Sequence, residues 1–274
     1  MLTPLLFSLP VFGLLFWCVE RPYRDPNRPR RSGRDWRLDL SYWFFTPLVS
    51  KPLTHFVVAL IVFTGAALMG VRLNAETGVA PLVAGSPISS LPSAVQALLI
   101  LVLSDFLGYW AHRTTHQGWL WRLHAIHHSP RRLDWLSAVR LHPLNSVLMR
   151  TIQAAPLLLL GFNPLLLAGV APLLGLYALL LHARVPWSFG PLGYVIASPV
   201  FHRWHHSSTV IGRNFAGLLP VWDILFGTFY LPRGVLPEAV GVEGLVLPQR
   251  LSGQLWAPWN RTLWDAPQQK ERPQ

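Results

Sequence analysis

The chain has 274 residues, of which 51% are hydrophobic and only 13% are charged. Soluble domains carry about 25% charged residues, so this composition excludes an ordinary water-soluble domain, and it also excludes disordered and collagen-like chains. The 23 Lys and Arg residues outnumber the 12 Asp and Glu residues and give a formal charge of +11, which predicts an anionic partner such as a nucleic acid or a membrane surface.

Three apolar segments precede residue 111, at residues 2–19, 53–71 and 91–110. Each approaches the roughly 20 residues that a spanning helix needs. The first segment lacks the basic leader and small-residue cleavage site of a secretory signal, so we expect it to stay in the mature protein. Further along, residues 144–181 form one apolar block with Gly161, Asn163 and Pro164 at its centre, which predicts a turn between two helices of marginal spanning length. We therefore expect four or five transmembrane helices.

The positions of Lys and Arg predict the orientation of these helices. Of the 23 basic residues, 21 lie in residues 20–51, 111–143 and 184–274, whereas residues 73–90 and 161–164 hold none. Cytoplasmic loops are enriched in Lys and Arg, so we expect the three basic segments to face the cytoplasm of a bacterial inner membrane. Because the charges flank apolar segments, a membrane surface is favoured as the anionic partner and nucleic acid is not expected.

The sequence thus predicts an all-α, polytopic integral membrane protein with four to five transmembrane helices and a cytoplasmic histidine-rich metal-binding cap. We divide it into N-terminal spans with a basic cytoplasmic loop (residues 1–110), a histidine-cluster core (residues 111–232) and a C-terminal cytoplasmic or interfacial tail (residues 233–274). The core includes the membrane hairpin at about residues 144–181.

Ten of the eleven histidines lie between residues 112 and 206, and eight of them form the clusters HxxxH, HxxHH and HxxHH. Positions i, i+3 and i+4 of a helix share one face, so each cluster can aim two or three imidazoles at one point. Imidazole suits Fe, Zn, Cu or Ni, and the single cysteine excludes a thiolate site. Ten nitrogens are too many for one ion and suffice for two. The predicted ligands are His112, His116, His124, His127, His128, His142, His182, His202, His205 and His206.

Asp105 is an ionisable residue inside an apolar segment, which makes it a candidate for the site. It precedes His112 by two helical turns and His116 by three, so the three residues share a face. We interpret its carboxylate as an acceptor that orients an imidazole N–H. Pairing with Arg113 is the alternative.

Two further polar residues follow the last cluster. We expect Asn214 to complete a metal shell directly or through water, and Asp223 to hold Arg203 or a histidine. A structural role in a turn is the alternative for both. His55 lies away from the clusters and is interpreted as a solvated or capping residue.

Residues 100–232 resemble the fatty acid hydroxylase / sterol desaturase superfamily of integral membrane non-haem metal oxidases. The likeness rests on Asp105 with YWAHR at residues 109–113, LWRLHAIHHS at 120–129, RLHP at 140–143, HRWHHS at 202–207, NFAG at 214–217 and WDILFGT at 222–228. One departure is His182, because members that hydroxylate fatty acyl chains often carry a second histidine four residues after this position.

The resemblance implies a binuclear iron centre, with zinc as an alternative occupant after purification, that activates O₂ against a C–H bond. The implied substrate is a fatty acyl chain, a sterol or a related lipid, and both hydroxylation and desaturation stay open. Some relatives carry a fused cytochrome b5-like domain with an HPGG motif, whereas here His142 and Pro143 are followed by Leu144. We therefore expect a separate electron donor, a ferredoxin or a cytochrome b5-like protein with its reductase.

The function predicted from the sequence is that of an oxidoreductase, an O₂-dependent lipid C–H oxidase. A non-catalytic membrane metal carrier or sensor that uses the same histidines is the alternative. A carrier needs a polar path through the membrane, and apart from Asp105 the predicted spans are almost uniformly apolar.

Overall fold

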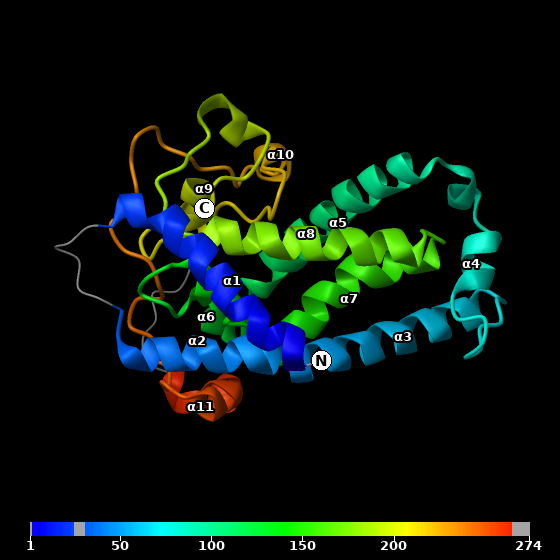
Figure 1. Ribbon diagram of the computed structural model, residues 1–274, viewed down its shortest axis with the longest axis horizontal. Coiled ribbons are helices and arrows are strands. Elements are labelled where there is room, and N and C mark those ends of the chain that lie inside the picture. The colour runs from blue at the N-terminus through cyan, green and yellow to red at the C-terminus, as the bar shows by residue number, and fades with distance from the viewer. Residues whose placement is uncertain (1, 25–30, 265–274) are drawn as a thin grey trace.

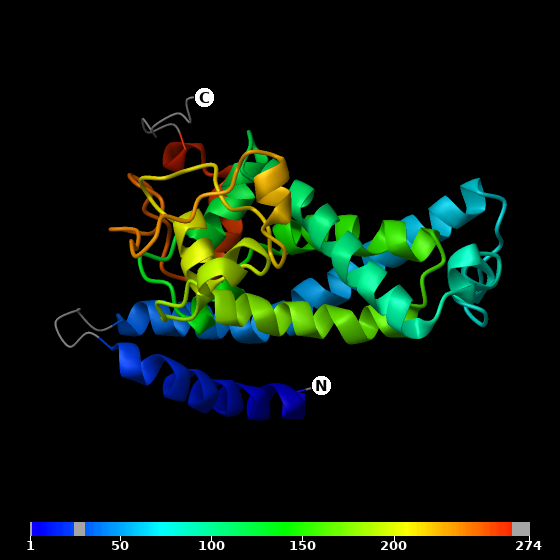
Figure 2. The same ribbon diagram turned by 90° about the horizontal axis from the view of Figure 1, so that it is seen from above.

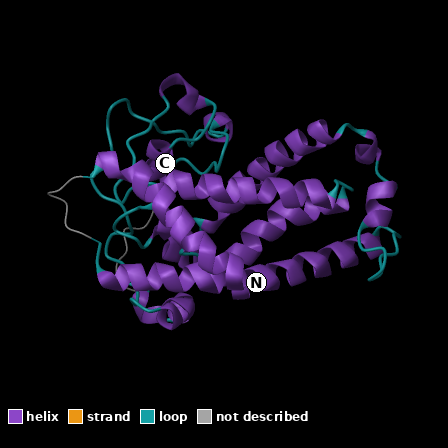
Figure 3. Ribbon diagram, in the orientation of Figure 1, coloured by secondary structure: helices purple, strands orange, loops and turns teal. Residues whose placement is uncertain are grey.

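The computed structural model describes residues 2–24 and 31–264, and all regular elements in these residues are helical (Figure 3). Apart from one isolated β-bridge between Ser207 and Val240, the described residues form no extended pairing. The all-α prediction is confirmed. Residues 25–30 of the predicted basic loop and residues 265–274 of the predicted tail lie outside the described residues.

The helices follow one another along the chain with short 3₁₀ turns between several of them. They are α1 (Leu2–Glu20), α2 (Gly33–Phe45), α3 (Lys51–Leu68), α4 (Ala80–Ala84), α5 (Ser93–Thr115), α6 (Leu120–His128), α7 (Pro143–Leu159), α8 (Pro164–His182), α9 (Pro199–His205), α10 (Val221–Leu225) and α11 (Leu251–Trp256).

Four helices of the described chain are long and apolar enough to cross a membrane, which makes this a multi-pass membrane protein. They cover Leu5–Tyr23, Gly33–Leu68, Ser93–Thr115 and Pro164–His182. The second is α2 and α3 joined into one rod by a π-helical turn, Thr46–Ser50. α7 has 17 residues and packs against both α3 and α5.

The helix α1 lies beside α2 and the residues after α6, whereas α3, α5, α7 and α8 form the bundle (Figures 1 and 2). Phe12 meets Trp43 of α2 at 5.9 Å between ring centroids, and Phe16 stacks on Trp135 at 5.3 Å. At the end of the helix, the Glu20 carboxylate accepts the backbone N–H of Arg184 at 3.0 Å. These contacts fix α1 to the end of the molecule that carries the histidines.

The hairpin of α7 and α8 turns at Gly161, which adopts a left-handed φ of 82°. A Cβ at this position would lie 2.4 Å from the Ser86 Cβ and 2.6 Å from the Leu82 carbonyl oxygen, so only glycine allows this close approach. Ser86 also donates a hydrogen bond to the Leu160 carbonyl at 2.6 Å. The turn and the segment between α3 and α5 therefore meet at one end of the bundle.

The opposite end holds α6, α9, α10, α11 and the long loops that connect them (Figures 1 and 2). α5 and α8 both run into this end and finish there with histidines in their last turns. We call this end of the molecule the cap.

Candidate metal centre

The histidines come from four helix ends that meet in the cap. His112 lies in the last turn of α5, and His182 is the last residue of α8. The clusters of α6 and α9 end those two short helices. Helix ends therefore bring together residues that are far apart in the sequence.

Nine histidines fall into two groups, and in each group one ring nitrogen per residue lies within 4.8 Å of those of the other members. Group A contains five histidines and group B contains four. Group A is His112, His116, His124, His128 and His205, and group B is His127, His182, His202 and His206.

The Nε2 atoms converge in both groups. In group A, the Nε2 of His124 lies 3.0 Å from that of His112 and 3.2 Å from that of His128. In group B, the Nε2 of His182 lies 3.2 Å from those of both His127 and His202. Nitrogens packed this closely around one point are the arrangement that binds a metal ion.

The two HxxHH clusters divide their residues between the groups in opposite ways. In α6, His124 and His128 are four residues apart and join group A, while His127 joins group B. In α9 and its last turn, the pair spaced by four, His202 and His206, joins group B instead, and the residue between them joins group A. Each short helix therefore links both groups, and the His128 and His206 rings stack between them at 4.2 Å.

Four rings use their Nδ1 atom to hold a backbone carbonyl. His112 bonds to the Phe215 carbonyl at 2.7 Å, and His182 bonds to that of Ala178 at 2.8 Å. The Nδ1 of His205 lies 2.9 Å from the Arg213 carbonyl, and that of His127 lies 3.3 Å from the Arg140 carbonyl. A carbonyl only accepts, so these Nδ1 atoms carry the proton and each Nε2 is left as a bare lone pair.

Burial keeps the rings neutral and ready to ligate. Apart from half-buried His112, all members of both groups are buried. Burial lowers the pKa of His116, His124 and His205 well below its usual value, and neighbouring imidazoles lower it further. The buried Nε2 atoms of His116 and His205 have no hydrogen-bond partner among the described residues. Such unpaired buried nitrogens require a partner, and a metal ion supplies one.

The loop after α9 carries Phe215, whose carbonyl contacts His112 of group A. Asp223 fixes the conformation of this loop. Its carboxylate accepts the backbone N–H groups of Phe215 at 2.7 Å and Ala216 at 2.8 Å, and the Thr228 hydroxyl at 2.6 Å. The Phe215 carbonyl in turn accepts a hydrogen bond from the Nδ1–H of His112. Asp223 therefore orients an imidazole through one peptide unit, whereas the sequence suggested that it would hold a histidine or Arg203 itself.

Asp105 acts on the same loop and contacts no imidazole in the described structure. Its carboxylate accepts the backbone N–H groups of Leu218 and Leu219, both at 2.8 Å, and the Trp222 Nε1–H at 3.0 Å. This corrects the expectation of a direct bond to a histidine. The carboxylate fixes the far end of the loop that carries Phe215.

Asn214 is fully engaged with the backbone. Its side-chain amide donates to the carbonyls of Phe201 and Tyr230, at 2.9 and 2.7 Å, and its oxygen accepts the Tyr230 N–H at 2.7 Å. The residue adopts a left-handed φ of 59°, which asparagine tolerates better than most residues. The structure therefore places Asn214 in the alternative role of a turn residue, with no free oxygen for a metal.

His142 lies outside both groups. Its Nδ1 accepts the backbone N–H of Leu144 and so caps α7, and its Nε2 lies 3.1 Å from the Leu255 carbonyl. Both ring nitrogens are thus used by the backbone. His55 is exposed on α3 and belongs to neither group.

Comparison with known proteins agrees with this geometry. Residues 97–228 match the sequence profile of the family described as fatty acid hydroxylase, and these residues include both histidine groups. Residues 97–228 are therefore a fatty acid hydroxylase domain. This confirms the superfamily that the motifs indicate.

The relatives of this hydroxylase domain include enzymes that are named for lipid or aldehyde substrates. The chain is 35% identical over 173 residues to the ornithine lipid hydroxylase OlsE of Rhizobium tropici, which covers 62% of this chain and 52% of the relative. It is 34% identical over 128 residues to the alkylglycerol monooxygenase of Homo sapiens, covering 46% and 28%. It is 28% identical over 137 residues to the very-long-chain aldehyde decarbonylase GL1-8 of Oryza sativa subsp. indica, covering 48% and 51%.

The match thus spans about half, or less, of the length of these relatives. No solved structure matches the chain.

Two aromatic residues of the hydroxylase domain cover group A, and the sequence reasoning missed both roles. The Trp121 ring lies 5.1 Å from that of His116 and 5.4 Å from that of His128. Phe215 lies 5.0 Å from the His116 ring and 5.7 Å from that of His205. Trp121 was accessible to sequence reasoning, since it precedes His124 by three positions and His128 by seven, on one helical face.

Proposed function

We propose that this chain is an O₂-dependent lipid C–H oxidase with two iron ions, one in each histidine group. The observation that carries the proposal is the convergence of Nε2 atoms in group A and group B. Nine imidazoles without a thiolate suit Fe, Zn, Cu or Ni, and the resemblance to the fatty acid hydroxylase / sterol desaturase superfamily favours iron among them. The bound iron pair would supply the O₂ activation and the electron transfer that no side chain of this set provides.

The residues of the domain would prepare the centre in three ways. The backbone carbonyls of Phe215, Arg213, Ala178 and Arg140 hold four Nδ1 protons, so the opposite nitrogens stay free to ligate. Burial keeps the imidazoles neutral at pH 7. Trp121 and Phe215 cover group A with apolar surface and limit the access of water.

The substrate class follows from the relatives by analogy. One relative is named for ornithine lipid and another for alkylglycerol, so we propose a lipid with an unactivated C–H bond as the substrate. Hydroxylation or desaturation of a fatty acyl chain, a sterol or a related lipid would fit. Electrons would come from a separate ferredoxin or cytochrome b5-like protein with its reductase.

We also propose that the cap faces the cytoplasm of a bacterial inner membrane, because most basic residues flank this end. In the same proposal, residues 1–110 anchor the chain, residues 111–232 form the oxidase core and residues 233–274 form a cytoplasmic or interfacial tail.

The test is a comparison of whole-cell lipids from a bacterial host with and without the chain. We expect a lipid that is heavier by one oxygen or lighter by two hydrogens, and an added oxygen should carry the label when the cells grow under isotope-labelled O₂. His205→Ala and His206→Ala, at normal abundance in the membrane, should give no product. Unchanged lipids in several hosts, together with bound metal and no O₂ consumption in the presence of a reductant, would instead support a metal carrier.

A further inference from the structure

A pocket of about 550 Å³ lies in the cap and is lined in part by the residues that directly follow His128. It lies between the start of α2, the residues that follow α6 and the segment 245–249. Its polar lining is dominated by guanidinium groups, and we call it the arginine pocket: Arg31, Arg34, Arg131, Arg132 and Arg140, with Asp35 beside them. Pockets of this volume accept small molecules or lipid headgroups.

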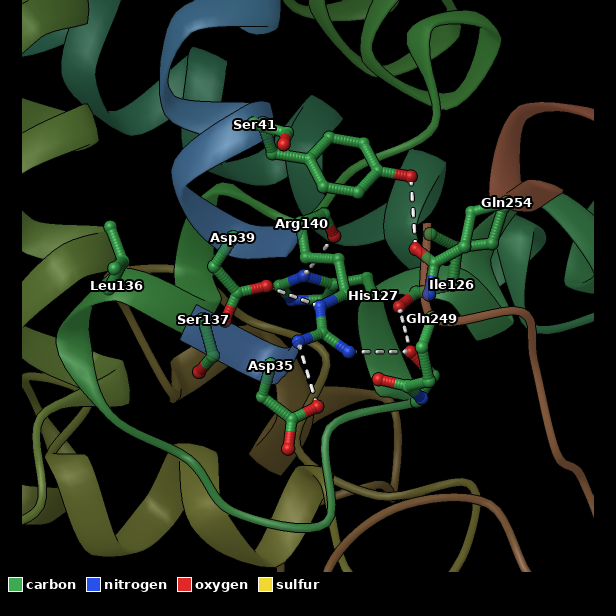
Figure 4. Close-up of polar contacts among 12 residues, drawn as sticks. Asp35, Asp39, Ser41, Ile126, His127, Leu136, Ser137, Arg140, Gln249 and Gln254 are labelled. Carbon is green, nitrogen blue, oxygen red and sulfur yellow. Dashed lines mark hydrogen bonds and ion pairs between the residues drawn. The ribbon is translucent and has the colours of Figure 1, made fainter. Parts of the chain in front are cut away.

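Arg140 forms a fixed, buried part of the lining. Only 2% of its surface is exposed, and its guanidinium contacts Asp39 and Asp35 (Figure 4). It also donates to the Ser129 hydroxyl at 3.4 Å. Arg31 is held in the same way, since its guanidinium pairs with Asp39 and, at 3.0 Å, with Asp134. The three carboxylates hold these two guanidinium groups in place.

The other three arginines lack such partners in the described part of the chain. Within residues 2–24 and 31–264, no ion pair or hydrogen bond of the Arg34, Arg131 or Arg132 side chain is found. Only Arg31 and Arg140 of the five arginines pair with the three carboxylates, so the pocket keeps an excess of positive charge. Leu245 and Leu247, both buried, add an apolar wall on one side.

The arginine pocket adjoins both histidine groups through the backbone. Ser129 directly follows His128 of group A. The Arg140 carbonyl accepts a hydrogen bond from the Nδ1–H of His127 of group B (Figure 4). The Arg140 guanidinium lines the pocket. A molecule bound in the pocket would therefore contact Arg140, whose carbonyl positions His127 of group B, and Ser129, which is the chain neighbour of His128 of group A.

We propose that the arginine pocket binds a phosphate or carboxylate group of a molecule of headgroup size. Guanidinium groups recognise these anions with paired, charge-assisted hydrogen bonds, and arginines already fixed by carboxylates lose little freedom on binding. The apolar wall fits the carbon part of such a molecule. The anion comes either from a membrane lipid or from a water-soluble phosphate ester, and the pocket does not depend on the proposed oxidase activity.

The proposal is tested with the full-length protein in nanodiscs of phosphatidylcholine. The soluble probe is sn-glycerol 3-phosphate, titrated by calorimetry with glycerol as the uncharged control. The lipid-borne probe is phosphatidylglycerol mixed into the nanodiscs, with retained lipid counted by native mass spectrometry. Arg131→Gln/Arg132→Gln is the pocket variant. Arg37→Gln/Arg233→Gln is the matched control, because both residues are exposed and lie outside the pocket lining. The two substitutions remove the same amount of charge as those of the pocket variant.

We expect saturable binding of at least one probe, weakened about tenfold in the pocket variant and unchanged in the control, as the loss of charge-assisted hydrogen bonds predicts. Binding of the soluble ester identifies a soluble source, and retention of phosphatidylglycerol alone identifies a lipid. Equal weakening in both double variants would show general surface charge and overturn the proposal. The proposal would also be overturned if neither sn-glycerol 3-phosphate nor phosphatidylglycerol bound to the wild-type protein.

Discussion

At the scale of single residues, the facing ring nitrogens of His127 and His182 give the strongest evidence for a bound cation. Each donates its Nδ1 proton to a backbone carbonyl, so each presents a bare Nε2 lone pair, and these two atoms lie 3.2 Å apart. Two lone pairs at this distance repel each other and have lost their water through burial. A metal ion between them turns the repulsion into ligation.

His182→Ala should therefore lower bound metal from about two ions per chain to about one, because group B would keep three imidazoles of four. Metal content of the purified protein checks this by elemental analysis. His142→Ala is the matched control, since the ring of His142 only caps α7 and contacts a carbonyl. If both variants keep two ions, His182 is not a ligand.

Asp223→Asn should weaken group A without removing a ligand. An asparagine offers one acceptor oxygen in place of two, so one of the loop N–H groups loses its bond, at a cost of about 1–3 kcal/mol. Because the loop orients His112, metal affinity should fall by about 10–100-fold at one of the two sites. Chelator titration measures the affinity, and the exposed Glu243→Gln serves as the charge-matched control. Two unchanged affinities would show that the loop does not position His112.

At the scale of elements, the centre depends on short helices whose histidines face two sites at once. The i, i+4 pair of α6 faces group A, and that of α9 faces group B. The middle histidine of each helix faces the other group, because a step of three residues turns about 60° short of a full turn. The two helices therefore bind the two halves of the centre together.

This division predicts how double variants behave. His128→Ala/His205→Ala removes two members of group A, so group B should still hold about one ion. His205→Ala/His206→Ala removes one member of each group and should lower the occupancy of both. Metal content compared across these two double variants and their single variants separates the patterns. Equal losses in the two pairs would contradict the assignment of the groups.

Metal binding by the histidine clusters could be predicted from the sequence, because helical spacing places residues i, i+3 and i+4 on one face. It could not divide them between two groups, since that division depends on how α6 and α9 pack against each other. His142 was expected as a ligand from its place between clusters, but a histidine before Pro143 also suits a helix cap, and the structure uses it so. The role of Asp39 was not foreseen, because its partner Arg140 lies 101 residues away.

At the scale of the whole molecule, the apolar helices place the cap at one end, and α4 and the turn between α7 and α8 at the other (Figure 1). The helix count and the hairpin followed from the lengths of apolar segments. The position of α1 did not, because an apolar helix of this length fits the bundle equally well, and its packing on Trp43 and Trp135 is a matter of tertiary contacts.

The orientation remains a prediction that reporter fusions can check. A reporter inserted after Gly85 should read outside the cytoplasm, and one fused to the C-terminus should read inside, because the basic segments flank the cap. A fusion at Gly212, in an exposed loop of the cap, should agree with the C-terminal one. Reversed signals would place the histidine groups on the outer side.

The central claim is that the two histidine groups hold two iron ions, and the metal content of the wild-type protein tests it most directly. The measurement is the molar ratio of iron to protein in folded protein purified from iron-supplemented cells, determined by elemental mass spectrometry. The account predicts about two iron ions per chain, because groups A and B each bring four or more imidazole nitrogens within 4.8 Å of one another. A folded protein that holds one ion or none under these conditions would contradict it.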